Sequence, residues 1–363
     1  MFVDFDKLKS VSSQEFDAVL VISPVNRRYI TNFPSSAGFV LITPEKTVYI
    51  TDFRYYGSAL DAQKNCRIDA NIEIVLQDNR VWENINEIFS NAKKVLVEES
   101  HLTLSSLQRL KEKLPGKTFV NGASEIISKL RAVKTDEEIG YIKKAQEITD
   151  KAFSYIVNFI SDNLGKLDFT EQKVALELEY FMRANGSEGV AFDSIAVSGK
   201  KSAMPHGVPT DILVQKGFLT MDFGAKVSGY CADMTRTVCI GGPSEKMKHV
   251  YNTVLEAQLK ALEFISAGKT GKEIDTVARE FIDKNGYEGK FGHSLGHSLG
   301  LEVHENPNFS PSENGIIPQG AVISVEPGIY LDDEFGVRIE DIVRVTENGH
   351  ENLTKSPKEL IIL

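Results

Sequence analysis

Apolar positions at strand spacing and at helix spacing are mixed in the first 125 or so residues of the chain. In this first part, five short runs rich in β-branched residues are typical of strands, and residues 102–114 carry apolar positions at helical spacing. The strand-like runs are residues 18–22, 39–42, 47–50, 72–75 and 94–97. We therefore predict a smaller α/β domain at residues 1–127, in which we find no metal-ligand spacing and no phosphate-binding loop.

A charged segment at residues 128–138 is interpreted as a linker that ends in a helix start. Thr135 is a suitable N-cap, and the three acidic residues after it favour the positive end of the helix dipole. Apolar residues then recur at helical spacing as far as Phe159, and a second helix spans about 170–185. Strand and loop patterns follow this helix pair.

The same order of elements then recurs. One helix begins after Ser244, and another begins at Thr270, where Glu273 completes a capping box. Strands and loops follow again. Two rounds of helix, helix and antiparallel strands predict an internally duplicated α+β domain at residues 139–363.

Two aspartates lie on one predicted hairpin. A two-residue turn at Ser228–Gly229 places Asp222 opposite Thr235, and Asp233 then points to the same face as a diagonal neighbour of Asp222. A solvent-exposed pair on an edge hairpin is the alternative. Because strands usually avoid aspartate, two on one face favour a ligand role.

Two glutamates occupy similar positions near the end of the chain. A strand from Ala321 reaches Glu326 and breaks directly after it, at a Pro-Gly pair. Residues 335–345 predict a single strand in which Arg338 and Glu340 share one face, opposite an apolar one.

Three of the seven histidines lie between residues 291 and 305, namely His293, His297 and His304. The first two have the four-residue spacing of a helical metal-binding pair, but the glycines around them disfavour a helix. Four carboxylates and one imidazole suit two divalent cations, for which Mn, Co, Zn and Fe are all compatible. In such two-metal sites a bridging water becomes hydroxide near neutral pH and can attack a carbonyl.

Composition narrows the class of partners. The chain has 51 acidic and 41 basic residues and a net charge of −10, which disfavours binding to nucleic acid or to an anionic membrane. Its three cysteines, Cys66, Cys231 and Cys239, are too few for a disulfide framework, and no apolar run reaches the length of a membrane span. We therefore expect a protein of the reducing cytoplasm.

The motifs MDFGA, ADMTRT, GHSLGLEVHE, VEPGIY and GVRIED together resemble the metallopeptidase family that includes methionine aminopeptidase, prolidase and aminopeptidase P. The resemblance implies the pita-bread (creatinase/aminopeptidase) fold. It also implies a metal-ligand set of Asp222, Asp233, His297, Glu326 and Glu340. One departure is Ser298, where many relatives have glycine; since it is also small, we expect little consequence.

The first part of the chain adds to the resemblance. The segment NRRYITNFPSSAGFVLIT, followed by TDFRY, is similar to the creatinase-type N-terminal domain of the proline-specific branch, which methionine aminopeptidases lack. The resemblance therefore implies an Xaa-Pro aminopeptidase or Xaa-Pro dipeptidase that forms a homodimer. The resemblance also implies that the enzyme holds two divalent ions, with Mn or Co favoured.

By the same resemblance, His297 is the one histidine of its group that ligates metal. His304 would bond the substrate carbonyl or oxyanion, and His293 would line the pocket. His206 would contact the substrate and steady the leaving amine, with a loop histidine as the alternative. Arg338 would orient the metal carboxylates or meet the substrate's carboxyl end, with a surface arginine as the alternative.

The implied reaction is hydrolysis of an Xaa-Pro bond, at the N-terminus of a peptide or in a dipeptide, by metal-activated hydroxide, with Glu326 also acting as general base. Tyr330 and Phe192 would line a proline pocket or pack in the core. An enzyme limited to dipeptides is the first alternative. A metal-free binding module or a creatinase-like hydrolase of the same fold is the second, which the complete set of five ligands disfavours.

Overall fold

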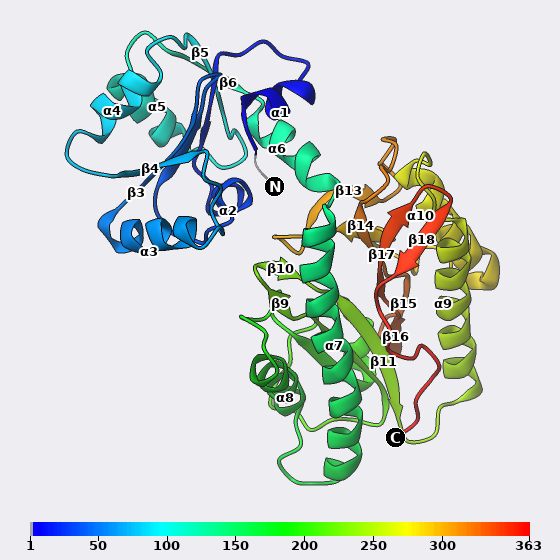
Figure 1. Ribbon diagram of the computed structural model, residues 1–363. Helices are drawn as coiled ribbons and strands as arrows, with labels where there is room; N and C mark the ends of the chain where they lie inside the picture. The colour runs from blue at the N-terminus through cyan, green and yellow to red at the C-terminus, as the bar shows by residue number, and fades with distance from the viewer. Residues whose placement is uncertain (1–2) are drawn as a thin grey trace. The chain divides into compact units, whose positions relative to one another are not determined.

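The computed structural model describes residues 3–363 and forms two compact units, Met1–Arg131 and Ala132–Leu363 (Figure 1). Helix α6 (Ala123–Ala132) ends near this division, and three residues separate it from α7 (Asp136–Asn163). The segment 128–138 thus covers the end of α6 and the start of α7. The domain bounds 1–127, 128–138 and 139–363 stay a prediction.

The first unit is an α/β domain built on one mixed sheet. Its strand order is β4-β3-β2-β1-β5-β6, in which β2 pairs antiparallel with β1 and β3, and the other neighbours are parallel. The strands are β1 (Ala18–Val21), β2 (Phe39–Ile42), β3 (Thr47–Thr51), β4 (Ile72–Leu76), β5 (Lys94–Val97) and β6 (Thr118–Asn121). The five predicted strands are confirmed, and β6 is an addition.

Helices pack against this sheet because their apolar faces complete its core. Val81 and Ile85 from α4 and Leu110 from α5 join buried strand residues in one cluster. The helices of the unit, besides α6, are α1 (Phe5–Ser10), α2 (Pro24–Thr31), α3 (Phe53–Lys64), α4 (Val81–Ile88) and α5 (Leu104–Lys113).

The second unit begins with a helix pair and an antiparallel sheet. Thr135 and Glu138 form the capping box that starts α7, and α8 (Glu171–Ala184) packs beside it. The sheet order is β11-β8-β7. Its elements are β7 (Ile195–Ser198), the 3₁₀ helix η1 (Gly199–Ala203), β8 (Gly217–Phe223), β9 (Lys226–Val227), β10 (Tyr230–Cys231) and β11 (Met234–Ile240).

The second half repeats this order, as predicted. Helix α9 (Glu245–Phe264) packs against α10 (Gly271–Ile282), which starts at a capping box of Thr270 and Glu273 and leads into the π-helical turn η2 (Asp283–Tyr287). The sheet order is β13-β12-β14-β17-β18, with β15 and β16 as a separate ribbon. These strands are β12 (Gly296–Ser298), β13 (Glu305–Phe309), β14 (Val322–Val325), β15 (Gly328–Leu331), β16 (Phe335–Arg338), β17 (Asp341–Thr346) and β18 (Gly349–Asn352).

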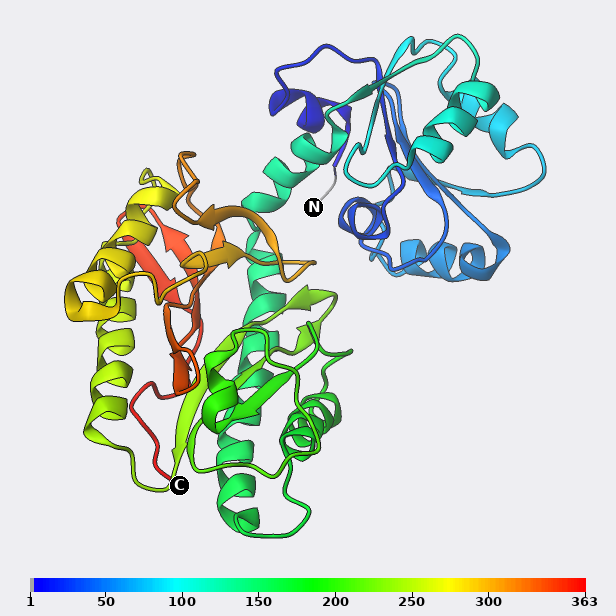
Figure 2. The same cartoon turned by 180° about the vertical axis from the view of Figure 1, so that it is seen from behind.

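Strands of the second unit lie between α7 and α9, as the two opposite views show (Figures 1 and 2). Each helix pair buries the apolar face of its own sheet: α7 and α8 cover β8 and β11, while α9 and α10 cover the second set. The opposite, more polar faces of the two groups of strands therefore face each other inside the second unit. Among residues 3–363, every helix is too short or too polar to cross a lipid bilayer.

The predicted hairpin register is confirmed. Val227 pairs with Tyr230, and Asp222 pairs with Thr235. Ser228 and Gly229 turn the chain with φ of 49° and 83°, the left-handed values that a type I′ turn requires.

The prediction of a single strand over residues 335–345 is wrong. The segment forms β16, which pairs with β15, and β17, which pairs with β14 and β18. The chain passes from one sheet to another at Ile339 and Glu340, which belong to neither ladder. The sequence alternation is also interrupted here, because Glu340 and Asp341 are consecutive acidic residues, but one such interruption does not distinguish an irregularity within one strand from a change of sheet.

Candidate metal centre

Nine of the residues singled out in the sequence line one cavity of about 560 Å³ in the second unit, as does Phe192, whereas Tyr330 is buried and does not line it. The nine come from both halves of the unit: six lie on strands β8, β12 and β16 or directly beside β11, β14 and β17, and the other three, His206, His293 and His304, lie in connecting loops. The nine are His206, Asp222, Asp233, His293, His297, His304, Glu326, Arg338 and Glu340.

Asp222 and Asp233 enter the cavity from the first half. Asp222 is on β8, whose opposite side chains Leu219, Met221 and Phe223 are fully buried in the core. Asp233 directly precedes β11 and is 4% exposed. The apolar back of the strand therefore fixes which face the carboxylates occupy.

His297 enters from β12, so the spacing of His293 and His297 is not that of a helical pair. His297 Nε2 lies 3.6 Å from Asp233 Oδ2 and 3.3 Å from Glu326 Oε1. The preceding Gly296 allows a close approach to β14, because a Cβ there would lie 1.8 Å from the Ser324 carbonyl oxygen.

Ligand atoms of Asp233, His297 and Glu340 all lie within 4.8 Å of one another, a spacing at which they could share a metal ion. Two nearby carboxylate oxygens, Asp222 Oδ1 and Glu340 Oε1, are buried without a hydrogen-bond partner. Buried polar atoms of this kind require compensation. Oxygen-rich donors with one imidazole therefore fit a site for divalent cations.

The electrostatics of the carboxylates lead to the same conclusion. Burial, followed by repulsion from neighbouring carboxylates, raises the pKa of Asp233 and Glu340 well above the usual range. Burial also raises the pKa of Asp222, against the opposing effect of Arg338. Such a cluster is unfavourable as a set of anions unless positive charge lies between them.

Glu326 differs from the other carboxylates. Burial alone would raise its pKa, but the hydrogen bond and charge of His297 outweigh burial and lower the pKa to about 2. For His297, burial opposes the charged ring, but Glu326 prevails and raises the pKa. Ser324 Oγ also donates a 3.1 Å hydrogen bond to Glu326 Oε1.

Arg338 is directed toward protein groups rather than toward open space. Its guanidinium donates to Asp222 Oδ2 at 2.7 Å, to Tyr330 Oη at 3.0 Å and to Thr235 Oγ1 at 2.9 Å. A fourth bond goes to the Pro205 carbonyl at 3.2 Å. Of its two predicted roles, the geometry therefore favours orientation of a carboxylate.

The remaining histidines border the same cavity. His304 is partly exposed, and its ring centroid lies 4.4 Å from that of His297. Partial burial, then the neighbouring His297, lowers the pKa of His304. His293 Nε2 lies 2.9 Å from Tyr330 Oη, and His206 is exposed at the cavity wall.

Thr235 is part of the site that sequence reasoning missed. It appeared in the sequence as the register partner of Asp222, yet its buried hydroxyl contacts both Glu340 and Arg338. The signal available was its position opposite Asp222 on the face that carries the carboxylates.

Comparison with known proteins gives matches along nearly the whole chain. Residues 140–347 match metallopeptidase family M24, and residues 8–133 match the creatinase/prolidase N-terminal domain. The chain is 38% identical to the Xaa-Pro dipeptidase of Pyrococcus furiosus over 357 residues, which cover 98% of each protein.

Solved structures confirm the predicted fold class. The Xaa-Pro dipeptidase from Bacillus anthracis is 41% identical, with a TM-score of 0.92 over 99% of this chain and 98% of that one. The X-Pro aminopeptidase from Thermotoga maritima is 38% identical, with a TM-score of 0.87 over 96% of this chain and 98% of that one.

Proposed function

The chain belongs to metallopeptidase family M24, and we propose that it hydrolyses the bond between an N-terminal residue and a following proline. The observation that carries this proposal is the convergence of five donor side chains, from two halves of one unit, on a single cavity. The named relatives act on Xaa-Pro substrates, which sets the bond to test first.

The residues that would hold two divalent cations are Asp222, Asp233, His297, Glu326 and Glu340, with Mn or Co favoured and Zn or Fe compatible. When bound, such ions polarise a carbonyl and lower the pKa of water. The two buried carboxylate oxygens that lack partners, on Asp222 and Glu340, support this assignment.

Glu326 is proposed as the general base. Its carboxylate is ionised at neutral pH, because the neighbouring His297 lowers its pKa, and Ser324 holds it by a hydrogen bond to Oε1. An ionised carboxylate can accept a proton from water. His304 would donate a hydrogen bond to the oxyanion that develops on the scissile carbonyl. His206 would then steady the leaving proline nitrogen.

An apolar stretch of the same cavity is suited to the proline ring. Phe192, Ile195, Val208 and Pro209 line the cavity together with His206. Proline has no amide hydrogen and a fixed φ, so a site shaped around its ring accepts a bond that ordinary peptidases fit poorly. We propose that His293, which lies 2.9 Å from the buried Tyr330 hydroxyl, forms the polar border of this pocket.

The proposal is tested by metal analysis of the purified chain, together with hydrolysis of Ala-Pro and Ala-Pro-Ala. Cleavage of both substrates is expected. Cleavage of Ala-Pro alone would instead indicate an enzyme limited to dipeptides. Failure to cleave either substrate at saturating Mn²⁺ would overturn the proposal. We also propose that the chain forms a homodimer, as the family resemblance implies, and light scattering would show a monomer if this is wrong.

A further inference from the structure

Glu340 lies between β16 and β17, in neither ladder, so its backbone groups need partners elsewhere. Its N–H donates to the Thr235 carbonyl at 3.1 Å. Its own carbonyl accepts a short hydrogen bond from Arg236 Nη1. The position of Glu340 is therefore set by contacts with β11 rather than by a regular strand.

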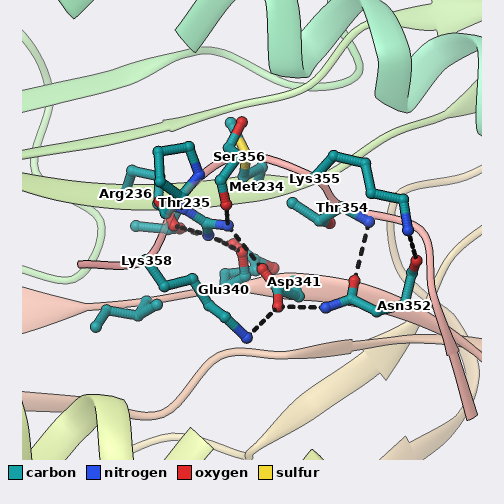
Figure 3. A network of polar contacts seen from close by, with 12 residues as sticks. Met234, Thr235, Arg236, Glu340, Asp341, Asn352, Thr354, Lys355, Ser356 and Lys358 are labelled. Atoms are coloured by element: carbon teal, nitrogen blue, oxygen red, sulfur yellow. Dashed lines mark hydrogen bonds and ion pairs between the residues drawn. The ribbon is translucent and has the colours of Figure 1, made fainter. Parts of the chain in front are cut away.

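Arg236 is the centre of these contacts. It follows Thr235 on β11, so the two side chains leave the strand on opposite faces, and it is 1% exposed. Each of the five N–H groups of its guanidinium has a protein acceptor (Figure 3). The acceptors are Asp341 Oδ1 and the carbonyl oxygens of Thr235, Glu340, Ser356 and Pro357.

Asp341 neutralises Arg236 and connects it to the end of the chain. Its Oδ1 accepts from Arg236 at 2.8 Å, while Oδ2 accepts from Lys358 Nζ at 2.8 Å and from Asn352 Nδ2 at 2.7 Å. Asp341 also pairs in the sheet with Val325, the residue before Glu326. One buried carboxylate thus lies beside the backbone of two proposed metal ligands.

We propose that Arg236 and Asp341 form a positioning pair, which holds the Glu340 carboxylate where it can ligate the cations. The segment 352–358 is part of this support. Neither Arg236 nor Asp341 lines the cavity, so both act through Glu340. The inference rests on the ligand role given to Glu340 in the proposed function. The pair itself lies within residues 140–347, the part that matches the family, whereas the supporting segment 352–358 lies beyond that part.

Arginine is required by the geometry of the contacts. A planar fork of five donors reaches four carbonyl oxygens and a carboxylate together, whereas a lysine ammonium is a single point charge with three donors. Lysine at this position would keep the positive charge near Asp341 and lose most of the bonds to Thr235 and Glu340. The variant Arg236→Lys therefore tests the alignment of Glu340 while the positive charge beside Asp341 is kept.

The test compares Mn²⁺ binding by calorimetry, after chelator treatment, in the full-length chain and in Arg236→Lys. Loss of a group that orients a metal ligand typically weakens metal affinity about 10–100-fold, and we expect an apparent Kd raised within that range. For Ala-Pro, kcat should fall while KM stays unchanged. An unchanged Kd for Mn²⁺ in a folded Arg236→Lys protein would overturn the inference.

A matched control loosens the same segment without touching the pair. Asp150 accepts hydrogen bonds from the Ser356 N–H at 2.9 Å and from Ser356 Oγ at 2.6 Å. Asp150→Asn should lower the Tm and leave the Kd for Mn²⁺ unchanged. Equal losses of affinity in Asp150→Asn and Arg236→Lys would show general loosening and would also overturn the positioning role.

The variant Lys358→Met and the unmutated chain provide two further tests. If Arg236→Lys does not fold, Lys358→Met removes one cation from Asp341 at a less buried position; a raised Kd is then expected, and an unchanged one overturns the inference. An unmutated chain that binds no Mn²⁺ and cleaves no Ala-Pro would contradict the proposed function itself. An unmutated chain that binds Mn²⁺ while Arg236→Lys binds it equally well contradicts the positioning pair alone.

Discussion

The hydroxyl of Thr235 donates a 2.7 Å hydrogen bond to Glu340 Oε2, across the boundary between the two halves of the second unit. The hydroxyl oxygen of Thr235 also accepts a 2.9 Å hydrogen bond from Arg338 Nε, and Arg338 in turn donates to Asp222. Asp222 is also the strand partner of Thr235. One small side chain therefore links a carboxylate of the first half to a carboxylate of the second.

Thr235→Val should weaken Mn²⁺ binding, because the isosteric change leaves Glu340 without its donor. We expect a loss of about 1–3 kcal/mol in the free energy of unfolding, from a buried polar group left unpaired. Thr237→Val is the matched control: Thr237 is equally buried on the same strand, but its hydroxyl bonds the backbone of Arg338. Denaturant titration should show similar destabilisation in both variants, whereas calorimetry should show weaker Mn²⁺ binding in Thr235→Val alone.

Glu326→Gln should reduce kcat for Ala-Pro by roughly 10²–10⁴-fold, the usual contribution of a general base. The amide cannot accept the proton of water, while its size keeps the contact with Ser324. Circular dichroism should show a folded protein. The exposed Glu347→Gln is the control and should keep full activity. Near-normal turnover in Glu326→Gln would refute the assignment of the base.

His304→Ala should lower kcat by about 10²–10³-fold, as expected when one oxyanion donor is lost, and should leave KM little changed. The lowered pKa of His304 keeps the ring neutral at pH 7, so its donor would be an uncharged N–H. Steady-state kinetics with Ala-Pro measure both constants. His249→Ala, at an exposed position on α9, serves as the control; equal losses in the two variants would remove His304 from the mechanism.

The Tm of the chelator-treated protein should fall as the pH rises toward neutral. The pKa values of Asp233 and Glu340 are raised in the folded chain, first by burial. Folding therefore gains stability from their protonation below the unfolded-state pKa of about 4, and this gain is lost as pH rises through the folded-state pKa. Saturating Mn²⁺ should remove this loss, because it binds the ionised carboxylates.

Thermal unfolding across this pH range, with chelator and with Mn²⁺, measures the effect. Asp233→Asn combined with Glu340→Gln should give a Tm that varies less with pH in chelator. A Tm of the unmutated protein that rises with pH in chelator would contradict the predicted direction. Glu326, with its pKa of about 2, loses its own contribution only in strong acid, below this range.

Most of the fold could be predicted from the sequence where a local rule decides the structure. The N-cap at Thr135, the capping box at Thr270 and the turn at Ser228–Gly229 depend on residues three or fewer apart, and all three are confirmed. The change of sheet at Glu340 could not be predicted, because the two consecutive acidic residues Glu340 and Asp341 are equally compatible with an irregularity within one strand. Whether β16 and β17 share one sheet depends on which distant strands pair with each.

The residues of the candidate site also fall into those that the sequence could predict and those that it could not. Carboxylates in strands with apolar backs are visible as exceptions to strand composition, so the residues that line the cavity could be identified in advance. Thr235, Arg236 and Asp341 could not, since a threonine, an arginine and a second acid in a strand have ordinary explanations. Their roles arise from contacts more than 100 positions apart in the chain, between β11 and the segment around Glu340.

Two of the proposed ligands precede α9 and three follow it, so neither half could supply a full coordination sphere by itself. Bound ions would then cross-link the two halves of the second unit. Removal of the ions should allow local opening between the halves. Amide hydrogen exchange should then become faster first around residues 233–236 and 339–341, while the sheet faces covered by helices stay protected.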